Sequence, residues 1–176
     1  MAENALDRSR YAGRLILLHW LIAALVFLIW PLGLMIGFVK DEVKPSFYLL
    51  HESFGFLVLW LMLLRVGVRL AHSAPAKEGS VTMQRVAGLV HGLLYLLLIV
   101  MPVSGFLASN AYGFPLHWFG LVTVWSPIGK VPDLAGPLLS LHTACAWMLL
   151  VLVALHLAAT IYHQAVRRDG TLNRMI

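Results

Sequence analysis

The sequence predicts an all-α integral membrane protein, a four-helix bundle with both termini in the cytoplasm. Of the 176 residues, 60% are hydrophobic and only 12% are charged, about half the charged fraction of an ordinary soluble domain. Four apolar segments each approach or exceed the roughly 20 residues that an α-helix needs to cross a bilayer. Because these segments take up most of the chain, we expect one transmembrane domain over residues 1–176 and no separate soluble domain.

The four expected spans are residues 15–38, 47–70, 85–108 and 138–163. The first run is longer than the core of a signal peptide and no small-residue cleavage site follows it, so we expect it to be retained as a helix. The longest connection, residues 109–136, is rich in glycine, proline and aromatic residues. This composition predicts a loop at the membrane surface, with a short interfacial helix at about residues 116–122.

Lysine and arginine residues are distributed unevenly between the two ends of the expected bundle. Four spans place both termini and the loop at residues 71–84 on one side, whereas the other side holds only Lys40, Lys44 and Lys130. Loops rich in lysine and arginine stay in the cytoplasm, so the termini are predicted to be cytoplasmic. The cationic residues on the cytoplasmic side are Arg8, Arg10, Arg14, Arg65, Arg69, Lys77, Arg85, Arg167, Arg168 and Arg174. This topology explains the net charge of +5, so we expect membrane lipid and no nucleic acid as a partner.

The last apolar stretch carries three histidines, His142, His156 and His163. On an α-helix the first two are separated by about 21 Å of rise and only roughly 40° of azimuth, and His163 follows on nearly the same face. Ionisable groups inside a membrane are costly and usually functional, and they face the bundle interior. Two imidazoles placed in this way suit axial ligation of two stacked cofactors; the alternative is hydrogen bonding between helices.

Topology sorts the remaining histidines by depth. Near the outer surface, His51 is the one intramembrane partner for His142. Near the inner surface, either His19 or His91 could face His156. Imidazole is a good haem ligand, and helix bundles build such sites from facing helices. The sequence has no HExxH or CxxC motif and no phosphate-binding loop, which disfavours a zinc site or a nucleotide-binding enzyme.

Four histidine-bearing segments resemble the prokaryotic cytochrome b561 family of membrane di-haem cytochromes, in the family's order and over nearly the whole chain. They are RYAGRLILLHW (residues 10–20), LLHESFGFLVLWLMLLRVGVRL (49–70), GLVHGLLYLLLIVMPVSGFLAS (88–109) and LHTACAWMLLVLVALHLAATIYHQAVRRDGTLNRM (141–175). The resemblance implies a multi-pass protein of the bacterial inner membrane with two haem b groups.

Carried over residue by residue, the resemblance implies that His19 and His156 ligate the iron of the cytoplasmic-side haem b. His51 and His142 would ligate the iron of the periplasmic-side haem b. His91 and His163 would lie by a quinone pocket near the inner haem, or else form contacts between helices or with lipid headgroups.

Two further kinds of residue fit the resemblance. Arg65 and Arg69 could contact haem propionates, or could simply anchor the helix at the cytoplasmic surface. Gly55 and Gly105 could let a flat macrocycle approach the backbone, or could serve close helix packing.

The function that follows is an oxidoreductase that carries electrons from a periplasmic donor, with superoxide as the first hypothesis, to ubiquinone. With both axial positions filled, electron transfer is expected to be outer-sphere and to need no catalytic side chain. The outer loops are nearly balanced in charge, which does not favour steering of an anion. A second hypothesis is a membrane subunit that joins a periplasmic redox protein to the quinone pool, and a third is a haem-free structural or transport bundle.

Overall fold

The computed structural model describes residues 10–72 and 79–176, and within them the fold is all-α apart from one short β-hairpin. The long helices are α2 (Gly13–Met35), α3 (Lys44–Ala71), α4 (Val81–Tyr112) and α5 (Pro132–Tyr162). The short elements are β1 (His117–Trp118), β2 (Val122–Thr123), the π-helix η1 (His163–Arg167) and the 3₁₀ turn η2 (Leu172–Arg174). In the described residues four helices are long and apolar enough to cross a membrane, which confirms the predicted all-α four-helix membrane bundle.

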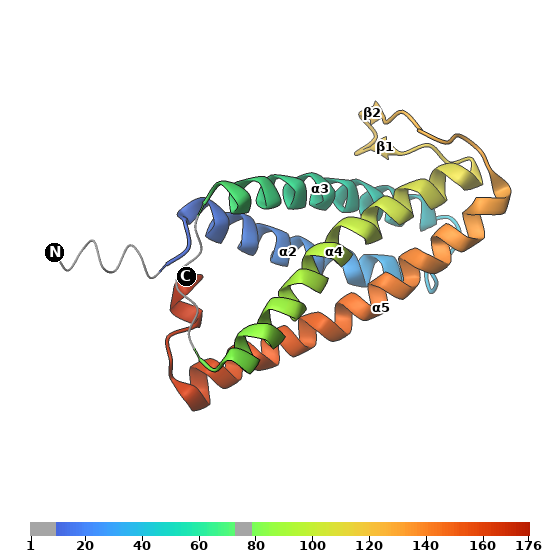
Figure 1. The fold of residues 1–176 in the computed structure, drawn as a ribbon. Helices are drawn as coiled ribbons and strands as arrows, with labels where there is room; N and C mark the ends of the chain where they lie inside the picture. The colour runs from blue at the N-terminus through green and yellow to red at the C-terminus, as the bar shows by residue number, and fades with distance from the viewer. Residues whose placement is uncertain (1–9, 73–78) are drawn as a thin grey trace.

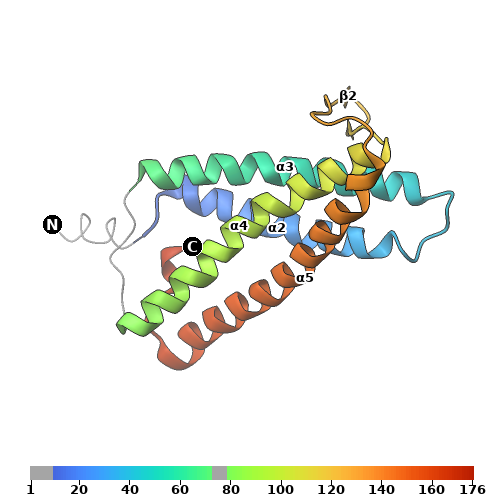
Figure 2. The ribbon, with the colours of Figure 1, turned by 45° about the vertical axis from the view of Figure 1, so that its right-hand side comes forward.

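The helices form two antiparallel pairs, α2 with α3 and α4 with α5 (Figure 1). The pairs lie close together near the β-hairpin and diverge toward the other end, where the red C-terminal segment lies between them (Figures 1 and 2). We call these the β-hairpin end and the C-terminal end of the bundle. The backbone N–H of Tyr11 donates to the carbonyl of Arg174 at 3.2 Å, which places both ends of the described chain together. Arg8 and Lys77, counted above, lie outside the described residues.

Helix ends differ from the predicted spans where local backbone chemistry outweighs hydropathy. The helix α4 begins earlier because Ser80 Oγ accepts a hydrogen bond from the N–H of Met83 at 3.3 Å. It ends at Gly113, whose φ of 96° is the left-handed conformation that closes many helices. The helix α5 begins at Pro132 rather than at residue 138, because proline suits the first helical turn.

The predicted interfacial helix at residues 116–122 is wrong. The chain forms a hairpin in which His117 pairs with Thr123 and Trp118 with Val122. Phe119, Gly120 and Leu121 connect the two strands. The first two have φ values of 50° and 72°, and two successive left-handed residues are typical of tight hairpin turns.

One serine on α3 anchors this hairpin. Ser53 is fully buried; its hydroxyl accepts the N–H of Phe119 at 2.7 Å, and its carbonyl accepts the indole N–H of Trp118 at 3.2 Å. The ring of Phe119 also packs edge-on against Phe54, with centroids 5.1 Å apart. These long-range contacts hold Phe119 in a conformation that a non-glycine residue rarely adopts.

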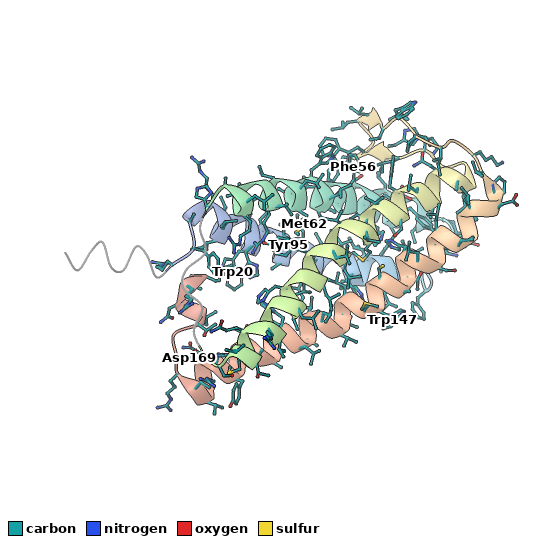
Figure 3. The ribbon with its side chains drawn as sticks, viewed as in Figure 1. Trp20, Phe56, Met62, Tyr95, Trp147 and Asp169 are labelled. Atoms are coloured by element: carbon teal, nitrogen blue, oxygen red, sulfur yellow. The ribbon has the colours of Figure 1, made fainter. Side chains whose placement is uncertain are left out.

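The buried side chains form two clusters, one in each helix pair. The cluster of the α4–α5 pair comprises Leu94, Leu97, Cys145, Leu149 and Leu152. The other comprises Ile22, Ile29, Val58 and Met62, with Tyr95 of α4 packed against it; Met62 and Tyr95 lie between α3 and α4 in Figure 3. The single cysteine, Cys145, is a packing residue. In lipid such clusters are stabilised by close packing rather than by removal of apolar surface from water.

Candidate functional site

The rings of His51 and His142 face each other across the bundle near the β-hairpin end. Their centroids are 6.0 Å apart and their planes are nearly perpendicular, at 84°. His51 comes from α3 and His142 from α5, so each helix pair contributes one ring. The structure thus brings together the two histidines that depth alone had paired.

Backbone carbonyls fix the tautomer of both rings. His51 Nδ1 lies 3.1 Å from the carbonyl oxygen of Ile29, and His142 Nδ1 lies 2.8 Å from that of Met101. A carbonyl oxygen can only accept a hydrogen bond, so each Nδ1 carries the proton. Each Nε2 then keeps its lone pair, which is the arrangement that metal-ligating histidines use.

Each ring packs against a glycine of the helix whose carbonyl it contacts. This glycine lies four residues after that carbonyl, at Gly33 for His51 and at Gly105 for His142. A Cβ on Gly33 would lie 2.5 Å from Cε1 of His51, and a Cβ on Gly105 would lie 2.7 Å from Nδ1 of His142. Gly105 therefore makes room for the imidazole of His142. At Gly55, by contrast, nothing lies within 4 Å of an added Cβ.

The ring spacing fits two axial ligands on one iron. A metal-bound imidazole nitrogen lies about 2 Å from the metal and the ring centroid about 1 Å farther back, so opposed rings have centroids about 6 Å apart. Within residues 10–72 and 79–176 no group of three or more His, Cys, Asp or Glu side chains could hold a metal ion by itself. A pair of imidazoles leaves the equatorial positions of an iron to another group, and a porphyrin supplies four of them. The residues present therefore fit a haem.

Nearer the C-terminal end, three histidines meet. The ring centroid of His156 lies 6.2 Å from that of His19 and 5.3 Å from that of His91, at interplanar angles of 74° and 82°. His91 is exposed, and its Nδ1 lies 2.6 Å from the carbonyl of Ala87 in its own helix. The His19–His156 spacing matches that of opposed axial ligands, whereas His91 approaches His156 more closely.

Arg65 lies beside this cluster, at the junction of three helices. Its Nε donates to the hydroxyl of Tyr95 at 2.9 Å and its Nη1 to the carbonyl of Leu15 at 3.3 Å. It lies close enough to His19 and His156 to interact electrostatically with both. A cation and a tyrosine hydroxyl are thus placed at the depth of the His19–His156 pair.

Arg69 lies one turn farther along α3 and contacts the surface loop. Its Nη1 donates to the carbonyl of His72 at 3.1 Å, and its guanidinium lies 6.0 Å from the ring centre of Tyr11. His163 lies at the end of α5, where its Nδ1 is 2.6 Å from Oδ2 of Asp169. Of the eight residues that the sequence suggested for cofactor or quinone binding, Arg69 and His163 are the two nearest the C-terminal surface.

Sequence reasoning missed the groups that hold the rings. Gly33 and the carbonyls of Ile29 and Met101 carry no sequence signature, because glycines are common in membrane helices and every residue has a carbonyl. Ser53 was missed as the hairpin anchor. The one available signal is spacing, since both glycines lie at the depth that the topology assigns to His51 and His142.

Comparisons with known proteins identify the family of this chain. The prokaryotic cytochrome b561 family matches residues 10–176. The chain is 30% identical over 170 residues to a probable superoxide oxidase CybB of Yersinia pestis, covering 96% of both chains. It is 33% identical over 167 residues to cytochrome b561 homolog 2 of Escherichia coli K12, covering 90% of this chain and 86% of the relative. It is also 31% identical to cytochrome b562 of Cereibacter sphaeroides over 172 residues, 94% of each chain.

A family match over nearly the whole chain and two relatives above 30% identity, matched over 86% and 94% of their length, establish the relationship. The name of the family implies haem b as the prosthetic group and electron transfer as the activity. Four apolar helices and bacterial relatives make this a multi-pass bacterial membrane protein. The chain belongs to the prokaryotic cytochrome b561 family of membrane electron-transfer proteins.

Proposed function

We propose that this cytochrome holds two haem b groups and carries electrons from a periplasmic one-electron donor to ubiquinone. His51 and His142 would ligate one haem iron, and His19 and His156 the other. The observation that carries the proposal is the pair of opposed imidazole couples, at 6.0 and 6.2 Å. They are separated by fourteen residues on α5, which is about 21 Å of helical rise.

A haem b held by two histidines would supply one-electron transfer and would leave no position on the iron for oxygen or substrate. The side chains of this protein then have to orient the cofactor and keep water away. The Nδ1–H bonds to the carbonyls of Ile29 and Met101 fix each ring and leave each Nε2 with its lone pair for an iron. We assign no side chain a covalent role.

Positive charge supports placing the C-terminal end in the cytoplasm. The described arginines gather at that end, whereas Lys40, Lys44 and Lys130 lie at the β-hairpin end. Since loops rich in arginine and lysine are retained in the cytoplasm, both termini would face inward and the β-hairpin would face the periplasm. The His51–His142 pair then lies nearer the periplasm, and the membrane is the inner membrane of the bacterium.

Quinone would be reduced at the C-terminal end. His91 and His163 lie there on α4 and at the end of α5, with Arg65 and Tyr95 in hydrogen-bonded contact nearby. Quinone reduction consumes protons as well as electrons, and imidazole is the side chain best suited to exchange protons near neutral pH. Arg65 is also placed to interact with a haem propionate, with Arg69 nearer the surface.

Superoxide is the donor we favour, because the relative in Yersinia pestis is named a probable superoxide oxidase. Two superoxide ions would each lose one electron to give two molecules of oxygen, and one ubiquinone would gain two electrons and two protons. The outer loops would steer an anion only weakly, because the positive charge of Lys44 is neutralised by Asp41 at 2.7 Å.

A redox partner protein is the second candidate for the donor. The connection between α4 and α5, which contains the β-hairpin, exposes the large apolar side chains Phe114, Leu121 and Trp125. A partner that docks on this apolar surface would deliver its electron close to the His51–His142 pair.

Anaerobic purification with haem-to-protein stoichiometry tests the cofactors, and superoxide-driven ubiquinone reduction tests the reaction. We expect two b-type haems per chain and quinone reduction that superoxide dismutase abolishes. A redox protein that copurifies, with no superoxide-dependent reduction, would favour the second candidate. A colourless protein would point instead to a haem-free structural or transport bundle.

A further inference from the structure

The helix α5 leads into an imidazole–carboxylate pair. His163 Nδ1 and Asp169 Oδ2 are 2.6 Å apart, and the two side chains are only 22% and 24% exposed. The other carboxylate oxygen, Oδ1, accepts the hydroxyl of Thr171 at 2.6 Å and its backbone N–H at 3.2 Å. Arg167 Nε donates to Oδ2 at 3.1 Å. Both oxygens of Asp169 are therefore held, and the carboxylate in turn fixes the ring of His163.

The backbone between His163 and Asp169 turns so that the two side chains meet. The α-helix widens into a π-helix from His163 to Arg167, and such π turns occur often at functional sites. Arg168 then adopts a left-handed φ of 52°, and Gly170 follows with a φ of 71°. A non-glycine residue in this region is strained, so the surrounding contacts must stabilise the turn.

The position of His163 relates this pair to the rest of the site. It lies seven residues after His156, which on a helix is about 10 Å of rise and nearly the same face. Nδ1 is engaged by the carboxylate, so Nε2 is the nitrogen that remains to exchange a proton.

We propose that Asp169 is a positioning residue that holds His163 as the proton donor to ubiquinone at the C-terminal end. This inference rests on the proposed function. Ubiquinone takes up two electrons, delivered from the donor, and two protons. Each proton leaves Nε2 of protonated His163 for a quinone oxygen, and the ring regains one from water at the membrane surface.

The charges around the pair favour this role. A carboxylate bonded to imidazole stabilises the protonated ring, because the two opposite charges attract. Hydrogen bonds from Thr171, and then from His163, hold the pKa of Asp169 below its ordinary value, so Asp169 remains a carboxylate at physiological pH. Three further contacts surround the pair in the described residues. The Thr171 hydroxyl lies 3.4 Å from His163 Nδ1, the ring of Tyr162 packs against that of His163, and Nη1 of Arg167 contacts Met83 of α4.

The test measures proton delivery separately from electron entry. Full-length protein is reduced anaerobically with a stoichiometric amount of dithionite and mixed with a short-chain ubiquinone analogue, and haem reoxidation is followed by stopped-flow absorbance. The measurement runs from about pH 5.5 to about pH 9, across the titration of imidazole. The variants are Asp169→Asn, the conservative Asp169→Glu, and Thr171→Val, which loosens the carboxylate but keeps its charge. Asp41→Asn, which makes the same chemical change in an exposed loop at the other end, is the control.

Asp169→Asn should move the basic limb of the pH–rate profile toward acid, because an amide stabilises a protonated imidazole less than a carboxylate does. Haem reoxidation at about pH 8 then slows about tenfold, while the rate at about pH 5.5 stays near that of the wild type. Asp169→Glu should recover most of the rate, Thr171→Val should fall between, and Asp41→Asn should match the wild type.

Superimposed profiles for Asp169→Asn and the wild type would overturn this inference and leave the proposed function standing. A wild-type protein whose reduced haems are not reoxidised by quinone at any pH would overturn both. If Asp169→Asn loses haem, the Thr171→Val variant provides the test. A pH–rate profile of Thr171→Val that matches the wild type would then reject the role of Asp169.

Discussion

Replacing Gly33 or Gly105 by alanine places a methyl group where an imidazole ring lies. The new Cβ would stand 2.5 Å from Cε1 of His51 in the first variant and 2.7 Å from Nδ1 of His142 in the second. Both separations are below 3.0 Å, a distance that real Cβ contacts essentially never reach, so the ring or the backbone has to move. Each ring is also hydrogen-bonded to the same helix that carries the new methyl group, so it cannot move away without weakening that bond.

The required displacement can be worked out from these distances. Ordinary contact begins at 3.4 Å, so Cε1 of His51 has to retreat by 0.9 Å and Nδ1 of His142 by 0.7 Å. Metal–ligand distances tolerate deviations of only about 0.2 Å. Disturbing the groups that orient a metal ligand typically costs about 10- to 100-fold in affinity. Each variant should therefore lose most of the haem between His51 and His142 and keep the other.

The assay is the haem-to-protein ratio of the purified variants, from reduced-minus-oxidised spectra. We expect the ratio to fall from about two toward about one in Gly33→Ala and in Gly105→Ala. Gly67→Ala and Gly88→Ala are matched controls, because they lie in membrane helices and nothing lies within 4 Å of an added Cβ. These controls should keep both haems and gain about 0.5–1 kcal/mol of helix stability.

Full haem content and an unchanged spectrum in both Gly33→Ala and Gly105→Ala would refute this account of how the rings are held. Loss of haem in the two controls as well would show that glycine is needed for helix packing in general rather than for ring placement.

The remaining predictions concern the ligands, the hairpin anchor and the C-terminal segment. His142→Ala and His156→Ala should each remove one haem and spare the other, as pyridine haemochrome assays would show; loss of both in either variant would contradict independent sites. Ser53→Ala removes the hydroxyl that accepts the N–H of Phe119 and should lower the free energy of unfolding by about 1 kcal/mol, measured by thermal melts. The pKa of Asp169 is lowered, so its carboxylate stabilises the folded segment above the ordinary aspartate pKa, and this stabilisation is lost as pH falls through the lowered value. Hydrogen exchange at the Thr171 amide should therefore show loss of protection below about pH 4.

The four membrane helices could be predicted from the sequence because hydropathy over about 20 residues is a strong signal. The depth of each histidine followed from its position along its span and from the up-and-down order of the spans, and so His51 could be paired with His142. The inner pairing could not be settled in this way, because His19 and His91 enter the bundle at similar depth and both approach His156.

Features that depend on single long-range contacts could not be predicted from the sequence. The aromatic, glycine-rich segment near residue 118 predicted an interfacial helix, but Ser53 stabilises a hairpin turn there through two hydrogen bonds. In the sequence, Asp169 is one polar residue of a polar C-terminal tail, and no pattern distinguishes it. Only the π turn and the left-handed Arg168 bring its carboxylate back to His163. Such backbone geometry leaves no periodic pattern in the side chains.

The carbonyl, the glycine and the imidazole at each half of the His51–His142 site all come from one helix pair. Ile29, Gly33 and His51 belong to α2 and α3, and the corresponding groups around His142 belong to α4 and α5. The first two helices to be synthesised can thus finish their half while the ribosome is still making the others. A haem bound between His51 and His142 would then join two half-sites that are each complete within one helix pair. Its removal should weaken the packing between the pairs while each pair stays folded.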